Sequence, residues 1–178
     1  MQRMVFRVSL MLAFAGVVAA VSILSFRHGV AEANEDSADP GLERARAQVR
    51  MLDDLYKTAI VFINDTYVED ADTPAAGEIA RELFGVMRAK GWHDARLIDG
   101  TGKPLNDDNR PKGDFETAAI KTILKGEAYY DAVVEEDGKR FLRAATVVPV
   151  VNDKCIMCHP GNKVGDVLGA VSYKLKIE

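Results

Sequence analysis

The sequence predicts an α+β domain built on an antiparallel sheet, with long helices in its amino-terminal part. Two observations carry this prediction. Apolar residues recur at helical spacing between residues 42 and 87, whereas beyond Gly91 short apolar segments alternate with polar residues and are separated by turns. One pair of these segments has the signature of a β-hairpin, which favours antiparallel pairing.

The first 33 residues have the pattern of a signal peptide. Arg3 and Arg7 precede an uncharged, mostly apolar run of nineteen residues, and Ala31-Glu32-Ala33 offers a cleavage site. The run is nearly long enough to cross a bilayer, so an uncleaved membrane anchor is the alternative. In both cases the arginines on the short side predict that the rest of the chain is exported, which in a bacterium means the periplasm.

The part that follows the signal peptide is acidic. The first 33 residues hold three arginines and one glutamate, so the remaining 145 carry 20 basic and 26 acidic side chains, a net charge of −6. Such a surface repels nucleic acid and suits a basic or neutral partner. Residues 34–41 are expected to be a solvated acidic leader, and residues 42–178 to form one domain of ordinary size.

Two helices are expected at the start of the domain. Apolar residues at helical spacing predict a long amphipathic helix over residues 42–67. A second helix should begin with Thr73 as its N-cap and Pro74 at its first position, and run through Met87. Lys90-Gly91 supplies the C-cap that ends it.

Strands, one more helix and turns are expected beyond Gly91. Asp137-Gly138 is a strong hairpin signal, because a type I′ turn needs positive φ at both central residues. The last strand alternates apolar with polar side chains, so one of its faces should lie on a core and the other in water. In chain order the expected elements are a strand at 95–98, a loop at 103–113, a helix capped by Asp114 and stopped near Gly126, hairpin strands at 128–135 and 140–151, and a last strand at 168–177.

The pentapeptide Cys155-Ile156-Met157-Cys158-His159 is the segment most informative about chemistry. Two cysteines two residues apart with a histidine directly after the second form the attachment sequence of a c-type haem. Each thiol would bond one vinyl group at the porphyrin edge, and His159 would be the proximal iron ligand. A disulfide, a redox dithiol and a zinc site are the alternatives, although zinc needs about four ligands and the chain has two cysteines and three histidines.

Several segments around this motif also carry a resemblance to a known family. They are Lys103-Pro104-Leu105-Asn106, Asn109-Arg110-Pro111, Phe115-Glu116, residues 138–145, 148–150 and 169–173, and the motif itself. Together they resemble the single-haem c-type proteins with a PAS-like (Per-Arnt-Sim) haem-binding domain, known as exported bacterial proteins and as periplasmic sensor domains of chemoreceptors. The likeness covers about residue 42 to the end. It implies a PAS-like sheet with an N-terminal helix packed over it, and one covalent haem c held by Cys155, Cys158 and His159.

The ligand on the other side of the iron is an open question at this point. Some members of that family supply it from an upstream cysteine, and this chain has no third cysteine. Met87, His93 and Met51 are the candidate ligands, beside a water molecule or a vacant position, although a methionine on a helical stripe is more often core filling. Among the basic residues, Arg143 is the preferred candidate for a contact with a haem propionate.

One-electron transfer in the periplasm is the function that the sequence favours, with a redox partner protein. The alternative is sensing of redox state or of NO, CO or O₂, with the signal read by a partner protein. A peroxidase-like enzyme is the least favoured reading, since it needs an open iron and a distal acid/base, for which His93 is the available histidine. The sequence shows no hydrolytic triad, phosphate-binding loop or catalytic carboxylate pair in a usable context, so a non-enzymatic role is expected.

Overall fold

The computed structural model describes residues 39–69 and 73–178. The predicted signal peptide or anchor at 1–33, and the leader up to residue 38, lie outside these ranges. In the described part of the chain, no helix has the length and apolar character needed to cross a membrane.

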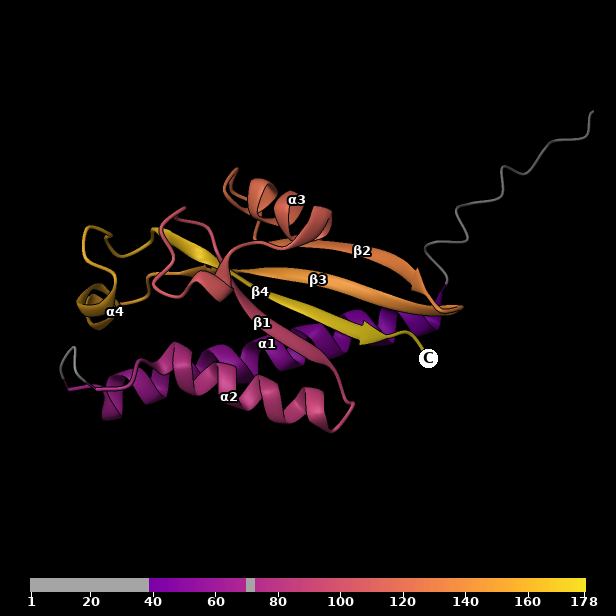
Figure 1. The fold of residues 1–178 in the computed structure, drawn as a ribbon, viewed down its shortest axis with the longest axis horizontal. Coiled ribbons are helices and arrows are strands. Elements are labelled where there is room, and N and C mark those ends of the chain that lie inside the picture. Colours follow the sequence, from indigo (N-terminus) through magenta and orange to yellow (C-terminus); the bar gives the residue numbers. More distant parts are fainter. Residues whose placement is uncertain (1–38, 70–72) are drawn as a thin grey trace, which may run out of the picture. The chain divides into compact units, whose positions relative to one another are not determined.

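The described chain forms a four-stranded antiparallel sheet with helices on both faces (Figure 1). Helices α1 and α2 cover one face, and α3 packs on the other. The elements in chain order are α1 (Pro40–Tyr67), α2 (Ala76–Ala89), β1 (Asp94–Asp99), a 3₁₀ turn (Asp107–Asn109), α3 (Gly113–Ile123), β2 (Tyr129–Glu136), β3 (Lys139–Pro149), α4 (Asp153–Cys158) and β4 (Val167–Lys176). This arrangement confirms the predicted α+β class and is consistent with a PAS-like fold.

Helix α1 begins two residues earlier than the sequence pattern predicts. The carboxylate of Asp39 accepts hydrogen bonds from the backbone N–H groups of Gly41, at 2.9 Å, and Leu42, at 3.1 Å. Asp39 therefore acts as the N-cap, and Pro40 stands at the first helical position, where its missing N–H costs nothing. The predicted boundary at residue 42 missed this cap because apolar periodicity begins only at Leu42.

Helix α2 begins later than predicted, at Ala76. Ala75 occupies the N-cap position with extended backbone (ψ 141°) and forms no side-chain capping bond, so Thr73 and Pro74 precede the helix. The physical reason is that the chain stays extended for one residue beyond Pro74, which places the proline outside the first turn. The C-terminal prediction is confirmed, because Gly91 follows the helix with a φ of +71°.

Helix α3 is capped by a different carboxylate from the one predicted. Its N-cap is Lys112, and the backbone N–H of that residue donates to the buried carboxylate of Glu116 at 2.7 Å. Asp114 lies inside the first turn, where a negative charge is favourable without acting as the cap. The loop before α3 contains a short 3₁₀ turn that Asn106 caps.

The hairpin of β2 and β3 turns where the sequence predicts. Asp137 and Gly138 have φ values of 50° and 68°, and Glu136 pairs with Lys139 across the turn. The strand order is β1-β4-β3-β2, so β4 pairs with β1 on one side and with β3 on the other. The last strand is therefore one of the two inner strands of the sheet. Its apolar face lies on the core, as predicted, but the opposite face, predicted to lie in water, is buried at Ala170 and Ser172 and exposed at Lys176.

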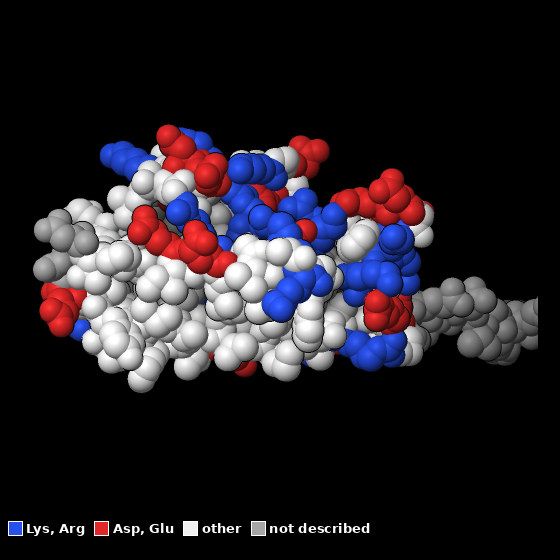
Figure 2. All heavy atoms as spheres, turned by 60° about the horizontal axis from the view of Figure 1, so that its bottom comes forward, with Lys and Arg blue, Asp and Glu red and all other residues white. Residues whose placement is uncertain are grey.

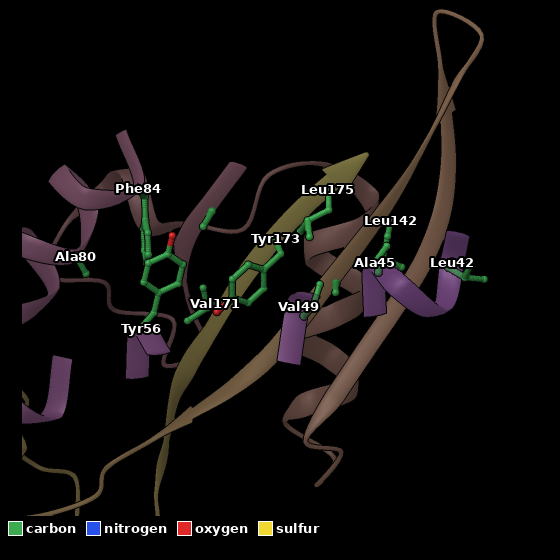
Figure 3. Close-up of a cluster of buried hydrophobic side chains, with 12 residues drawn as sticks. Leu42, Ala45, Val49, Tyr56, Ala80, Phe84, Leu142, Val171, Tyr173 and Leu175 are labelled. Atoms are coloured by element: carbon green, nitrogen blue, oxygen red, sulfur yellow. The ribbon is translucent and has the colours of Figure 1, made fainter. Parts of the chain in front are cut away.

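The core has two parts, one on each face of the sheet, because neighbouring strand residues point to opposite faces. Leu142, Ala144 and Val171 face α1 and α2, whereas Ala145 and Ala170 face α3. Figure 3 shows the larger cluster, in which Tyr56 and Phe84 meet edge to face with their ring centroids 5.0 Å apart. The residues of this larger cluster are Leu42, Ala45, Val49, Tyr56, Ala80, Phe84, Ala95, Leu142, Ala144, Val171, Tyr173 and Leu175.

Candidate functional site

The two cysteines of the motif lie on a short helix rather than on a loop. The side chain of Asn152 caps α4 by accepting the backbone N–H of Cys155 at 3.3 Å. Residues three apart on a helix share a face, so α4 presents Cys155 and Cys158 on the same side, with His159 directly following. Both cysteines are half-buried free thiols, not a disulfide.

Helix α4 is fastened to the C-terminal end of α1. The amide of Asn152 donates to the carboxylate of Asp65 at 2.8 Å. The ammonium of Lys154 donates to the backbone carbonyls of Asp65, at 2.6 Å, and Val68, at 3.5 Å. Because the last turn of α1 contains no basic residue of its own, Lys154 supplies the cation that the helix C-terminus favours.

A cavity of about 820 Å³ adjoins the motif. Cys155, Cys158 and His159 all line it, and its other walls come from the second half of α1, the start of α2 and the adjoining ends of β1 and β4. Its volume lies within the range typical of cofactor sites. Apolar side chains supply much of the wall, among them Ile60, Val61, Leu97, Ile98, Val148 and Val171.

A few polar side chains also reach the cavity wall, and one of them lacks a partner. Asn64 lines the cavity, and its Nδ2 is buried with no hydrogen-bond partner among the described residues. A buried donor left unsatisfied costs about 1–3 kcal/mol, so this amide favours a bound group that accepts its hydrogen. The thiol pair, the imidazole, the apolar walls and this free donor together fit the c-type haem that the motif predicts.

The histidine of the motif is held in its metal-binding form. Burial lowers the pKa of His159 below its usual value, and the nearby charge of Asp99 only partly opposes this. The neutral imidazole is the form that binds a metal. The carboxylate of Asp99 is itself engaged, since it accepts hydrogen bonds from Thr101 and Gly102 at 2.7 Å each.

None of the three side chains predicted as a second iron ligand lines this cavity. His93 is buried elsewhere and shares a 2.8 Å hydrogen bond with the hydroxyl of Tyr56. Met51 lies on the outer side of α1 with 61% of its surface exposed, and Met87 sits in the last turns of α2. Their positions give no support to a role as iron ligand.

The described cavity wall contains no other strong iron ligand from a methionine or histidine. The sulfur and imidazole groups among its described residues all belong to the segment 155–159. Within the described ranges, no cluster of three or more His, Cys, Asp or Glu side chains is placed to hold a metal ion, which gives no support to the zinc alternative.

Arg143, predicted to contact a propionate, lies on the α3 face of the sheet and does not line the cavity. Its guanidinium stacks on the ring of Phe115, 4.3 Å from the ring centroid, and its Nη2 is 3.5 Å from Oε1 of Glu116. Glu116 also pairs with Arg96. Arg143 thus belongs to a buried cluster of charged side chains on the α3 face and is not part of the cavity wall.

Sequence reasoning missed several polar residues that line the cavity, among them Lys57, Asn64 and Arg81. A signal for the first two was present, because Lys57, Ile60, Val61 and Asn64 recur at helical spacing beside the buried stripe of α1. The mixed polarity of that second stripe distinguishes it from the core stripe. Arg81 carries no comparable signal, since its location depends on how α2 packs beside α1.

Comparisons with known proteins agree with this fold. Residues 42–175 match the model of the Tll0287-like family. A solved structure described as the crystal structure of the cyanobacterial heme-protein Tll0287 is similar with a TM-score of 0.58 and 13% sequence identity, over 81% of this chain and 97% of that chain. At this identity the likeness establishes the fold alone. No curated protein matches the chain in sequence. Because the family model spans most of the chain, the protein belongs to the Tll0287-like family.

Proposed function

We propose that the chain is an exported protein that carries one covalent haem c, attached through Cys155 and Cys158, with His159 as the proximal iron ligand. One observation carries the proposal: Cys155 and Cys158 on α4, and His159 directly after it, all line a cavity of about 820 Å³ whose walls are largely apolar. The relative described as a heme-protein supports the same cofactor. The signal-peptide pattern of residues 1–33 supports export.

The haem, when bound, supplies a one-electron redox centre and an iron that takes ligands from both sides. The chain's own residues then have distinct tasks. His159 would coordinate the iron through the lone pair of its neutral imidazole, and the apolar walls would exclude water from the haem. Asn152 and Lys154 hold α4, and with it the attachment site, on the end of α1.

The lack of a predicted methionine or histidine ligand in the described cavity wall favours sensing or binding of a small ligand as the function of the haem. Met87 and His93 do not line the described cavity wall, and Asn64 presents a buried donor there without a partner. An iron without a strong protein ligand on that side accepts NO, CO or O₂, and a buried amide donor would stabilise a polar ligand. This ranking reverses the order expected from the sequence, where electron transfer came first because a single haem domain most simply exchanges electrons with a partner protein.

One-electron transfer is the second candidate, and a surface feature favours it. Apolar side chains around the motif are exposed, namely Val151, Met157 and Val164 at 44%, 40% and 53%. An exposed apolar rim at the attachment site would let a redox partner approach the haem edge. A partner docking there would not require an open iron position.

Covalent attachment is tested on the full chain, produced in a host that matures c-type cytochromes. Haem staining after denaturing electrophoresis should label the wild-type band in the periplasmic fraction. Cys155→Ser together with Cys158→Ser should abolish the stain, because both thioether bonds are lost. Met157→Ala, inside the same pentapeptide, is the matched control and should keep the stain. Absence of the stain from the wild-type protein would refute the proposal.

Optical spectra with and without CO separate the two functions. Rapid uptake of CO by the ferrous protein, with a high-spin spectrum before addition, supports sensing or ligand binding. A low-spin ferric spectrum with a methionine–iron charge-transfer band, and a ferrous form that CO does not alter, supports electron transfer instead. In that case Met87→Ala should remove the band, which would show that α2 rearranges around the bound haem.

A further inference from the structure

Two cationic side chains reach the described wall of the cavity, Lys57 from α1 and Arg81 from α2. Their positions along the helices are fixed by the aromatic contact next to them. The rings of Tyr56 and Phe84 meet at 5.0 Å, so the antiparallel helices α1 and α2 bring residue 57 and residue 81 to about the same level. Both cations therefore lie near one end of the cavity.

The cysteines lie near the other end. Helix α4 is fastened to α1 at Asp65, eight residues beyond Lys57, which corresponds to about 12 Å along the helix axis. The cavity wall formed by α1 thus runs from the thiol-bearing helix at one end to a pair of cations at the other. The acidic side chains of the described wall are Glu78, in the first turn of α2, and Asp99, which is engaged by its own turn.

A haem, like this cavity, has two chemically different ends. Its two vinyl groups lie on the half of the porphyrin opposite to its two propionates. With the vinyl groups bonded to Cys155 and Cys158, the propionates point away from α4. We propose that Lys57 and Arg81 bind the two haem propionates through charge-assisted hydrogen bonds. The inference rests on the proposed function, because it presupposes the covalent haem.

The donors of both cations are available for this task. Lys57 Nζ lies 2.8 Å from Oδ2 of Asp53, and the other oxygen of that carboxylate accepts the hydroxyls of Thr146, at 2.6 Å, and Tyr173, at 2.9 Å. Asp53 thereby engages one N–H donor of the ammonium and leaves the other two free. Arg81 forms no ion pair or hydrogen bond with any residue that the structure describes, so its whole guanidinium remains for a carboxylate.

The decisive measurement is the midpoint potential of the full, haem-loaded protein at pH 8. Removing cations beside the propionates favours the ferric state, which carries one more positive charge. Lys57→Gln together with Arg81→Gln should therefore lower the reduction equilibrium constant about tenfold, which is about 59 mV for one electron. The matched control, Arg50→Gln together with Lys90→Gln, removes two exposed cations from the same helices and should leave the potential near that of the wild type.

A potential in the double variant equal to that of the control would overturn the inference. A wild-type protein without covalent haem would overturn the proposed function instead, so the two failures are distinguishable. If the double variant does not accumulate, Arg81→Gln and Arg81→Lys are compared singly. The lysine variant retains a charge and should keep a potential nearer to that of the wild type, whereas equal potentials in the two variants would refute a role for the charge.

A second measurement isolates the propionates themselves. In the variant with Cys155→Ala and Cys158→Ala, haem can bind only non-covalently, and iron protoporphyrin can be compared with its dimethyl ester, which lacks both carboxylates. The cavity should bind the free acid at least tenfold more tightly than the ester. Adding Lys57→Gln and Arg81→Gln should remove most of that preference. An undiminished preference would show that other groups hold the propionates.

Discussion

The buried carboxylate of Glu116 is predicted to be a major source of stability for the α3 face. Its side chain is 3% exposed, yet it pairs with two arginines, Arg96 and Arg143, whose side chains are 24% and 25% exposed. It also accepts the backbone N–H of Lys112 at 2.7 Å. Glu116→Gln keeps the shape and one acceptor but removes the charge, which leaves two half-buried guanidinium groups without their counterion.

The expected loss follows from the burial of these groups. Removing one partner of a fully buried ion pair costs about 3–5 kcal/mol. Since about a quarter of each arginine side chain is exposed and water can solvate part of the charge, we expect Glu116→Gln to lower the free energy of unfolding by about 2–3 kcal/mol. This corresponds to a shift on the order of 1 M in the urea midpoint of a domain this size.

Equilibrium urea unfolding of the haem-loaded protein measures this loss. Glu127→Gln removes an exposed carboxylate shortly after α3 and serves as the matched control, with an expected change within about 0.5 kcal/mol. The haem spectrum of Glu116→Gln should stay that of the wild type, because the cluster lies across the sheet from the cavity. A loss below about 1 kcal/mol would refute the reasoning, and so would a shift of the haem spectrum.

Three further outcomes are expected. Phe84→Ala should lower the free energy of unfolding by about 3–5 kcal/mol in urea titrations, because Phe84 is 2% exposed and packs on Tyr56; a loss below about 1.5 kcal/mol would contradict this packing. Asp39→Ala should lower the urea midpoint by removing the cap of α1, and an unchanged midpoint would count against this role. Burial lowers the pKa of His93 from its usual value of 6.5, so the native state favours the neutral ring. The free energy of unfolding should therefore fall as the pH drops below 6.5, by at most about 1.4 kcal/mol per pH unit. His93→Gln should remove that part of the slope between pH 7 and pH 5, and identical slopes would refute the assignment.

The elements of the fold could be predicted from the sequence where their signals are local. The stripes of α1 and α2, the Asp137-Gly138 turn and the alternation of the last strand each involve residues within a few positions of one another. The strand order could not be predicted in this way, because the pairing of β4 with β1 joins residues 70 to 80 positions apart, Asp99 with Gly169 and Asp94 with Lys174. The capping contact of α3 was missed because Glu116 lies inside the helix, four residues after Lys112, whose backbone N–H it accepts.

In the candidate site, too, residues that are close in sequence could be predicted, and residues brought together by packing could not. Cys155 and Cys158 lie one turn apart on α4 and His159 follows directly, so these three residues are close because they are near in sequence. Met87 and His93 were chosen by residue type, and type does not tell which part of a helix or strand borders a cavity. The cavity wall of α2 extends only to Arg81, so Met87 lies beyond it in the same helix. The packing of the helices against one another, and not the residue type, determines which side chains reach the cavity.

The central place of β4 in the sheet has a consequence for the order of folding. As β4 follows every other strand in the chain, the sheet can close only after residues 167–176 have emerged from the ribosome and, in an exported protein, from the translocon. The segment that bears Cys155 and Cys158 emerges just before it. At that moment the sheet still lacks β4, one of its two inner strands. Both thiols, which are half-buried in the folded domain, would then be accessible to an enzyme that attaches haem. The proposed attachment of haem and the insertion of the last strand are therefore expected to be consecutive steps of one assembly process.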